Sequence, residues 1–334
     1  MRFGYSEACL AHDTGDRHPE NPDRLRAIRR GLAKRHGVEY TDASPASREA
    51  VTAVHDADYV DEFETFCADG GGSWDPDTVA GEETWDAALA SAGLAAWAAE
   101  AALDGKDGRQ TPFALGRPPG HHAVVDDAMG FCFFNNAAVA AQRVLDTGAA
   151  SRVAIFDWDV HHGNGTQDIF YDRDDVLYAS VHEDGLYPAT GAVSETGTGA
   201  GDGTTVNLAL AAGAGDADYQ YAIEEAIAPV LRRFDPDLLV VSAGFDAHRH
   251  DPISRMRVSS EGYALMADQL RTVADEVGAA VAYVLEGGYG LDTLADGVSM
   301  VHETYDGRAP VEPDESVDET TEASVETLRS AVGL

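Results

Sequence analysis

Residues 153–165 combine side chains that can bind a metal ion. They read Val-Ala-Ile-Phe-Asp-Trp-Asp-Val-His-His-Gly-Asn-Gly, an apolar run that ends in acids and imidazoles before two glycines. This order predicts a buried strand that delivers polar side chains at its carboxyl end, just before a tight turn. In an extended segment Asp157, Asp159 and His161 share one face. A carboxylate and an imidazole two residues apart can therefore bind the same ion.

The plainer interpretation of this segment is a strand end whose polar side chains only hydrogen-bond to the following turn. Such a turn does not need two adjacent histidines, His161 and His162, after two aspartates. Because it is costly to bury that many polar groups without a charge partner, we favour the metal site.

A second histidine pair, His121 and His122, follows a predicted strand at residues 111–116. A neutral imidazole is the side chain best suited to take and return a proton near pH 7. Its other ring nitrogen needs an orienting partner, and Asp157 and Asn164 are available. The alternative is a solvent-exposed pair, because histidines in loops are commonly exposed.

Two further predicted strands end in residues that can do chemistry. Asp246 would join Asp159 and His161 to give two carboxylates and one nitrogen, which leaves one coordination position open. This is the arrangement of a catalytic zinc, whereas structural zinc sites are closed and usually contain thiolates. Tyr289, which lies between glycines, can place its hydroxyl against a developing oxyanion. It also fits an ordinary turn with an exposed tyrosine.

The fold must bring these four strand ends together. Other apolar runs predict strands at residues 176–181, 205–210 and 279–285, with helices between the strands. This alternation predicts a mainly parallel sheet with right-handed crossovers. Because the carboxyl ends of parallel strands share one edge, where ligands bind, we expect the four ends to converge.

The predicted fold class is α/β, a single three-layer domain with a mainly parallel central sheet. We place this catalytic domain at residues 1–309 and expect a loose acidic tail at 310–334. Residues 44–104 are predicted helical, with a break at Gly70-Gly71-Gly72 between the helical segments. The glycine-rich segment 185–203 is too long for a simple connection, and long loops in compact domains tend to be functional.

Composition limits the partners and the compartment. The net charge is −36 and Lys34 and Lys106 are the only lysines, which excludes nucleic acid and anionic membranes as direct partners. The acids are spread along the chain, which favours a cytosol of high salt. The cysteines, Cys9, Cys67 and Cys132, are odd in number and unrelated in spacing, so we expect no disulfide. With no signal peptide or long apolar run, a soluble cytoplasmic protein is expected, and an oligomer is compatible with the sequence.

Taken together, these residues resemble the zinc-dependent histone deacetylase family, within the arginase–deacetylase fold. The resemblance covers about residues 5–302 and is closest to the class II and acetylpolyamine amidohydrolase branch. Six motifs carry it in order: His18-Pro-Glu-x-Pro-x-Arg24, Arg-Pro-Pro-Gly-His121-His122, Gly130-Phe131-Cys132, Asp157-x-Asp159-x-His161-His162-Gly-Asn164-Gly-Thr166, Ser-Ala-Gly-Phe-Asp246-Ala-His and Glu-Gly-Gly-Tyr289.

The resemblance implies roles for the catalytic residues. It implies one zinc ion on Asp159, His161 and Asp246. His122 would be the general base and acid, and His121 its electrostatic partner. The remaining expected catalytic residues are Asp157 behind His121, Asn164, which follows the class II pattern, and Tyr289, which would bind the substrate carbonyl. Because some class II members with histidine at that position deacetylate poorly, Tyr289 implies an active enzyme.

The resemblance also implies residues around the substrate. Gly130, Phe131 and Tyr187 would wall a channel for an acetylated alkyl-amine, the last where the family more often has phenylalanine. Arg24 would lie near the inner end of the site. Family members hold a structural potassium ion through the main chain around Asp157, Asp159 and His161, so the Ser180 hydroxyl is a candidate ligand here.

The expected reaction is hydrolysis of an N-acetyl amide on a protein lysine or on a polyamine. We favour acetyl-lysine, because Ile253 stands where polyamine-selective relatives carry a glutamate, although Asp184 or Glu183 could replace that acid. An arginase-like ureohydrolase with two manganese ions would require Asp-x-Asp where this chain has Asp246-Ala-His248. An inactive acetyl-lysine binding module would require a broken ligand set or the loss of Tyr289.

Overall fold

A parallel sheet forms the centre of the protein. The computed structural model describes residues 1–15, 17–105 and 111–334. The sheet has eight strands in the order β2-β1-β5-β10-β9-β6-β7-β8, and every pairing along it is parallel. Its strands are β1 (Arg2–Gly4), β2 (Glu39–Thr41), β5 (Pro112–Ala114), β6 (Val153–Asp157), β7 (Val176–Glu183), β8 (Thr205–Leu210), β9 (Leu238–Ala243) and β10 (Ala280–Leu285).

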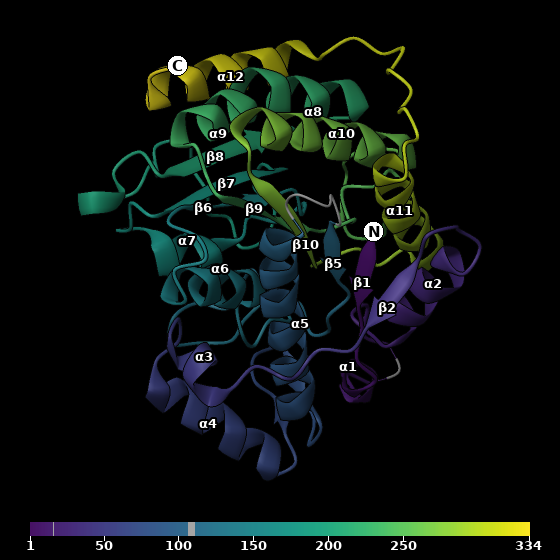
Figure 1. Ribbon diagram of the computed structural model, residues 1–334, viewed down its shortest axis with the longest axis vertical. Helices are drawn as coiled ribbons and strands as arrows, with labels where there is room; N and C mark the ends of the chain where they lie inside the picture. The colour runs from purple at the N-terminus through teal and green to yellow at the C-terminus, as the bar shows by residue number, and fades with distance from the viewer. Residues whose placement is uncertain (16, 106–110) are drawn as a thin grey trace.

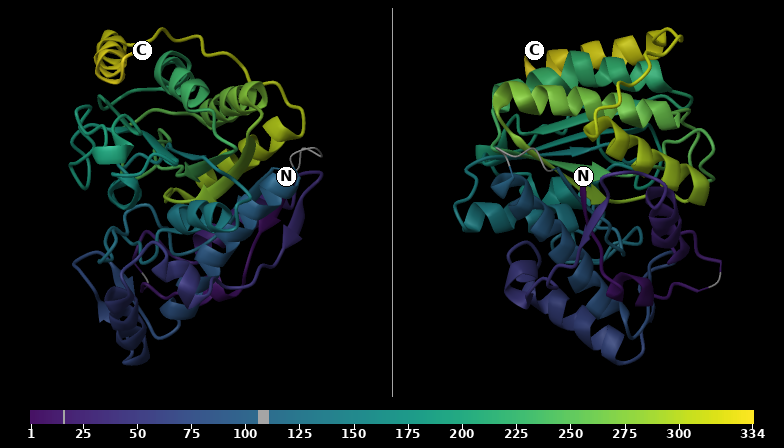
Figure 2. Two further views of the ribbon diagram at one scale, coloured as in Figure 1. Left: turned by 60° about the vertical axis from the view of Figure 1, so that its left-hand side comes forward. Right: turned by 45° about the vertical axis from the view of Figure 1, so that its right-hand side comes forward.

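Helices cover both faces of this sheet, which gives the three layers predicted from the sequence. Figures 1 and 2 show α5 and α6 on one face and α8, α9 and α10 on the other. The helices are α1 (Ala8–Ala11), α2 (Asp23–Leu32), α3 (Arg48–Thr52), α4 (Ala57–Ala68), α5 (Thr84–Asp104), α6 (Asn136–Asp146), α7 (Asn164–Phe170), α8 (Asp216–Ala222), α9 (Ala228–Phe234), α10 (Ser260–Val277), α11 (Leu291–Tyr305) and α12 (Glu319–Val332). A π-helical turn (Ile223–Ile227) joins α8 to α9, and a 3-10 turn (Gly199–Gly201) lies in the long loop before β8.

Local sequence explains the central elements. The inner strands β6, β9 and β10 are short apolar runs that are buried along their whole length, as strands covered on both faces must be. Helix α10 begins where the Ser259 side chain accepts a hydrogen bond from the main chain of Gly262, and it ends at Gly278 in the left-handed conformation.

Strand order brings the predicted site segments to one edge. The strands β5, β10, β9 and β6 are consecutive neighbours, and each is followed by one of the four motifs. In the register of the sheet, Asp157 at the end of β6 pairs with Ser242 of β9, and the next residue of β9, Ala243, pairs with Leu285 at the end of β10. The chain therefore leaves all these strands at the same edge, which confirms the predicted convergence.

Residues 44–104 are not helical throughout. A two-stranded antiparallel hairpin, β3 (Gly72–Ser73) and β4 (Val79–Ala80), separates α4 from α5. Beside it lies a second hydrophobic cluster, in which the rings of Phe63 from α4 and Phe133 stack with their centroids 4.6 Å apart. The hydroxyl of Thr78 in the hairpin accepts a hydrogen bond of 3.1 Å from the main-chain nitrogen of Phe131. The hairpin and cluster thus support the segment that carries Gly130 and Phe131.

The expectation of a loose tail at residues 310–334 is wrong for its second half. Helix α12 packs against β8, and its side chains Thr321, Val325 and Leu328 are buried. These three residues recur at intervals of four and three, which places them on one face of a helix, whereas the acidic composition around them indicated disorder. The domain boundary placed at residue 309 is a separate question, and it stays a prediction.

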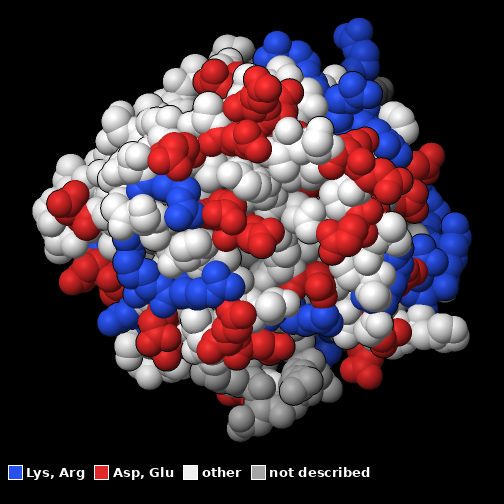
Figure 3. Space-filling view, turned by 90° about the horizontal axis from the view of Figure 1, so that it is seen from above, with Lys and Arg blue, Asp and Glu red and all other residues white. Residues whose placement is uncertain are grey.

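Charged side chains of both signs lie close together on one face of the molecule. Figure 3 shows acidic and basic groups interspersed on the face seen from above Figure 1. Cys9, Cys67 and Cys132 are free and buried, as expected from their spacing. Within the described ranges, the structure contains no helix with the length and apolar character needed to cross a membrane.

A buried cluster of charged side chains connects the N-terminal loop to the sheet. Glu20 accepts hydrogen bonds from Arg117 Nε (2.6 Å) and Nη2 (2.7 Å) and from Arg24 Nη1 (3.0 Å), and all three side chains are fully buried. Burial raises the pKa of Glu20, but the charges of Arg117 and Arg24 outweigh burial and lower this pKa to about 2. The cluster holds the loop before α2 against the segment that leaves β5.

We expect Leu328→Ala to lower the free energy of unfolding by about 2–4 kcal/mol, because it removes a fully buried side chain between α12 and β8. Chemical denaturation at one fixed salt concentration measures the change. The matched control is Glu326→Ala on the exposed side of the same helix, which should change stability by less than about 0.5 kcal/mol. Equal stability of the two variants would contradict the packing of α12.

Glu20 should make part of the stability depend on acid pH. Because its pKa is lower in the folded chain (about 2) than its ordinary value of 4.5, the ionised carboxylate contributes on the order of 3 kcal/mol above pH 4.5. This contribution is lost as the pH falls from 4.5 towards 2. We therefore expect the free energy of unfolding of Glu20→Gln, measured across this range, to fall less steeply with decreasing pH than that of the unmodified protein. Parallel curves would contradict the assignment.

Candidate metal centre and active site

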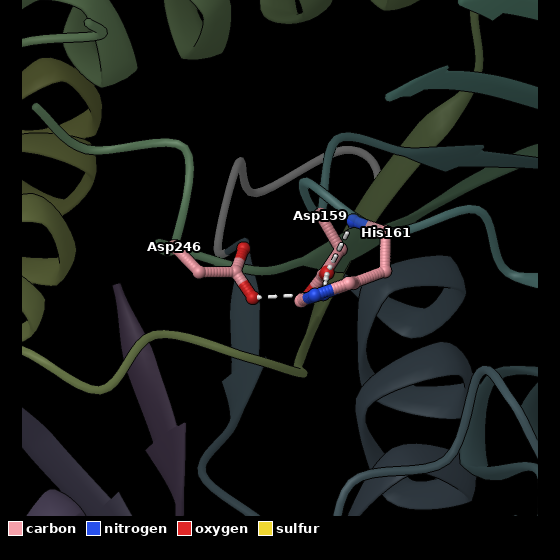
Figure 4. Close-up of side chains that lie close together, drawn as sticks. All are labelled: Asp159, His161 and Asp246. Atoms are coloured by element: carbon pink, nitrogen blue, oxygen red, sulfur yellow. Dashed lines mark hydrogen bonds and ion pairs between the residues drawn. The ribbon is translucent and has the colours of Figure 1, made fainter. Parts of the chain in front are cut away.

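Three predicted metal ligands lie together at the carboxyl edge of the sheet. Figure 4 shows Asp159 and His161, from the segment after β6, facing Asp246, from the segment after β9. One donor atom from each residue lies within 4.8 Å of the other two. His161 Nδ1 is 3.0 Å from Asp159 Oδ1 and 3.3 Å from Asp246 Oδ2. Both aspartates are fully buried.

The surroundings of this group fit a divalent cation. The buried Asp246 Oδ2 lacks a hydrogen-bond partner among the described residues, and burial followed by the charge of Asp159 raises the pKa of Asp246. Burial alone would lower the pKa of His161, yet the nearby carboxylates of Asp159 and Asp246 raise this pKa to about 10. The group thus favours positive charge strongly. Two carboxylates and one imidazole, three protein ligands in all, are the donor set of a catalytic zinc site.

Gly244 and Gly287 have no side chains, and the two carboxylates occupy the space where side chains would otherwise lie. A Cβ atom at Gly244 would lie 2.0 Å from Asp159 Oδ2, and one at Gly287 would lie 2.2 Å from Asp246 Oδ2. Main-chain amides fix the same carboxylates, since Gly287 N donates to Asp159 Oδ2 (2.8 Å) and Val160 N donates to Asp246 Oδ1 (3.0 Å). The ends of β6, β9 and β10 are therefore linked through the acids themselves.

His121 and His122 lie beside this group and are buried, so the exposed-loop interpretation is wrong. Their orienting partners differ: His121 Nδ1 is 2.9 Å from Asp157 Oδ2, and His122 Nδ1 is 2.8 Å from Asn164 Oδ1. Both partners were predicted from the sequence. The ring centroids of His122 and His161 are 5.9 Å apart.

The two histidines have opposite protonation tendencies. Burial lowers the pKa of His121, but the charges of Asp157 and Asp159 outweigh burial and raise this pKa to about 10. For His122 burial acts first, the positive charges of His121 and His161 add to it, and the pKa falls well below 6.5. One imidazole is thus cationic and its neighbour is a neutral base at pH 7.

Tyr289 belongs to a loop that is fixed from two sides. Asp251 Oδ2 accepts hydrogen bonds from the main-chain nitrogens of Tyr289 (2.7 Å) and Gly290 (3.0 Å). On the other side Arg24 Nε donates to the carbonyl oxygen of Gly288 (2.7 Å), and the guanidinium lies 5.1 Å from the centre of the Tyr289 ring. Arg24, expected near the inner end of the site, thus contacts the loop that carries Tyr289.

The predicted wall residues surround His122 and Tyr289. The Phe131 and Tyr289 rings meet edge to face at 5.9 Å, and Tyr187 meets the His122 ring in the same way at 5.1 Å. Gly130 has φ +56°, and a Cβ atom there would lie 2.5 Å from His122 Cδ2. Glycine is required at this position by both its conformation and the close approach of the base.

Three further residues considered from the sequence, Ser180, Ile253 and Glu183, contact groups other than the three metal ligands. Ser180 pairs with Asp157 across β6 and β7, and its Oγ lies 2.9 Å from His182 Nδ1, so its role as a potassium ligand stays a prediction. Ile253 is partly buried in the loop after β9, where its amide donates to Asp251 Oδ1 (3.1 Å). Glu183, considered as a replacement acid, is buried and paired with Arg255 at 2.6 Å. Its charge is therefore already compensated.

Sequence reasoning gave no role to two buried acids that hold the site, Asp251 and Glu286. Asp251 stands directly before a proline in the segment after Asp246, and Glu286 opens the motif that contains Tyr289. An acid next to an apolar strand end is a signal that could have identified Glu286. The partners of both residues lie far away in the sequence and could not be inferred from it.

Known proteins share this sequence and this fold. A family model described as the histone deacetylase domain matches residues 18–305. A histone deacetylase-like amidohydrolase of Pseudomonas aeruginosa is 38% identical over 311 residues, which cover 86% of this chain and 81% of the relative. A probable deacetylase of Methanothermobacter thermautotrophicus is 43% identical over 286 residues, 83% of this chain and 82% of the relative.

A solved structure gives the same result for the fold. The crystal structure of the HDA15 HD domain superimposes with a TM-score of 0.91 at 37% sequence identity and covers 99% of this chain and 93% of the other. The eight-stranded parallel sheet between helical layers is thus the arginase–deacetylase fold predicted from the motifs. The chain belongs to the histone deacetylase family and is a hydrolytic deacetylase.

Proposed function

We propose that this chain hydrolyses the acetyl amide of N-acetylated lysine side chains and that Asp159, His161 and Asp246 hold a zinc ion for this reaction. The observation that carries the proposal is the position of His122, which is held by Asn164 and lies 5.9 Å, between ring centroids, from His161 in a group of three side chains whose donor atoms suit a divalent cation. When bound, zinc supplies a Lewis acid that polarises the amide carbonyl and acidifies water.

The side chains around the metal centre divide the remaining work. The Nε2 atom of His122 takes a proton from the attacking water and returns it to the leaving amine. Asn164 holds the other ring nitrogen of His122, Nδ1. His121, kept cationic by Asp157, stabilises the negative charge that develops beside His122 during the reaction. The Tyr289 hydroxyl donates a hydrogen bond to the developing oxyanion. Its proton is retained at neutral pH, because burial raises the pKa of Tyr289 well above 10.

A polyamine carrying one acetyl group is the second candidate substrate, and a specific observation favours it. Burial and then the negative charge of Asp77 raise the pKa of Tyr187, and Asp75 and Asp127 add to this effect. These acids would attract a second, distant ammonium group of the substrate at the wall formed by Tyr187. Acetyl-lysine remains our first choice, because Ile253 offers no charge and Glu183 is paired.

A ureohydrolase and a non-catalytic binding module have less support. A two-metal ureohydrolase would need a further metal ligand after Asp246. Both ring nitrogens of His248 are already hydrogen-bonded, one to Ser260 Oγ (3.2 Å) and the other to the amide of His250 (3.2 Å). A module that binds acetyl-lysine without hydrolysis would not need His122 and Tyr289 beside a complete ligand set.

We expect Asp159→Ala and Asp246→Ala to lose zinc, whereas His122→Ala should keep zinc and lose at least about 10²-fold in kcat. Metal per chain after dialysis and steady-state hydrolysis of an acetyl-lysine peptide measure the two effects. Glu326→Ala on α12 serves as the surface control. Full activity of His122→Ala would remove this histidine from its assigned role, and full zinc content in both aspartate variants would remove the metal site.

Substrate choice is tested with an acetyl-lysine peptide and an acetylated diamine at several salt concentrations. We expect a higher kcat/KM for the peptide at every concentration. The diamine should lose kcat/KM as salt rises and in the double variant Asp75→Asn, Asp77→Asn, because screening or removal of these charges weakens attraction of the free ammonium. If the diamine is preferred at all salt concentrations, the acetylpolyamine is the substrate and our first choice is wrong.

A further inference from the structure

Glu286 is a fully buried acid at the active site to which the proposed reaction gives no part. It follows the last residue of β10, and its Oε2 accepts hydrogen bonds from two successive main-chain nitrogens, Gly120 (2.7 Å) and His121 (3.1 Å). Its Oε1 lies 3.3 Å from Ser242 Oγ of β9. The side chain therefore connects β10 with the segment that leaves β5.

The main-chain nitrogens hydrogen-bonded to Glu286 belong to His121 itself and to the residue before it, Gly120. Gly120 and His121 immediately precede His122, so the orientation of their peptide groups sets where the two imidazoles begin. The chain is tightly enclosed there, since a Cβ atom at Gly120 would lie 2.4 Å from the main-chain nitrogen of Asn136. A carboxylate that accepts two consecutive amides under such restraint fixes the main chain in one orientation.

Glu286 is itself held in place. Its main-chain nitrogen donates to the carbonyl oxygen of Ala243 (3.1 Å), and its carbonyl oxygen accepts a hydrogen bond from Arg24 Nη2. The next residue, Gly287, donates to Asp159 Oδ2 of the candidate metal centre (2.8 Å). One residue thus connects the main chain that carries the base to the main chain that contacts the metal centre.

We propose that Glu286 is a positioning residue, which fixes His121 and His122 relative to the metal centre through its hydrogen bonds to the amides of Gly120 and His121. The assignment rests on the proposed function for its effect on turnover. This positioning depends on the Glu286 oxygen that accepts the two hydrogen bonds, and it depends less on the negative charge of the side chain.

Three variants separate these contributions. Glu286→Gln keeps an oxygen that can accept both amides and removes the charge. Glu286→Asp keeps the charge but is one methylene too short to reach the amides. Glu286→Met fills the same space without an acceptor. We expect the Met and Asp variants to lose about 10–100-fold in kcat on an acetyl-lysine peptide with zinc content and KM within about twofold, whereas the Gln variant stays within about fivefold.

The chain offers a matched control on the opposite edge of the sheet. Asp237 Oδ2 also accepts two successive amides, from Ser151 (2.7 Å) and Arg152 (3.2 Å). Asp237, unlike Glu286, is only partly buried, so Asp237→Met removes the same pattern of hydrogen bonds near the surface and should leave kcat unchanged. A kcat of Glu286→Met within about threefold of the unmodified protein would overturn the proposal, and so would equal losses in the Gln and Asp variants. If the Met variant does not fold, the other two variants decide: the proposal requires a higher kcat for Glu286→Gln than for Glu286→Asp.

A readout independent of turnover keeps this inference apart from the proposed function. In protein labelled with 15N at histidine, the ring signals of His121 and His122, assigned with His121→Gln and His122→Gln, should shift in Glu286→Asp and not in Asp237→Met. Shifted signals in a protein that does not hydrolyse acetyl-lysine would retain the positioning role and refute the proposed substrate. Unshifted signals would refute the positioning role whatever the activity.

Discussion

Asp159 and Asp246 place two negative charges side by side in the interior, at the carboxyl edge of a parallel sheet, and the surrounding structure compensates for them. Burying a carboxylate is costly unless hydrogen bonds or a cation replace water. The amides of Gly287 and Val160 supply hydrogen bonds, and His161 supplies an imidazole that favours positive charge. Since these partners come from the ends of different strands, the sheet order is a requirement of the site and not only its scaffold.

The same compensation extends outward from the metal centre. His121 lies between the acids and His122, and its positive charge lowers the proton affinity of that second imidazole. Behind Tyr289, Arg24 is neutralised by Glu20, which also binds Arg117. Arg24 in turn reaches the segment between β10 and Tyr289 through the carbonyl oxygens of Glu286 and Gly288. The low pKa of His122 depends on its burial and on the neighbouring imidazoles of His121 and His161.

Much of this arrangement could be predicted from the sequence, because strands and helices have distinct apolar periods and the motifs follow strand ends. The convergence of His122, Asp159, Asp246 and Tyr289 follows from parallel pairing alone. Helix α12 was missed because the seven acids of residues 310–334 indicated disorder, although three residues of the helix are buried. The anchoring role of Glu286 was missed for another reason: its partner His121 is 165 positions away, and no local pattern records which main-chain amide a buried acid will meet.

Helix α12 has a consequence for how copies of this chain can associate. It packs against β8, the strand at one end of the sheet order. At the opposite margin β2 contributes only three residues. A neighbouring molecule that tried to continue the sheet by strand addition would meet a packed helix beside one edge strand and a very short strand at the other edge. Both features disfavour growth of the sheet from one molecule into the next.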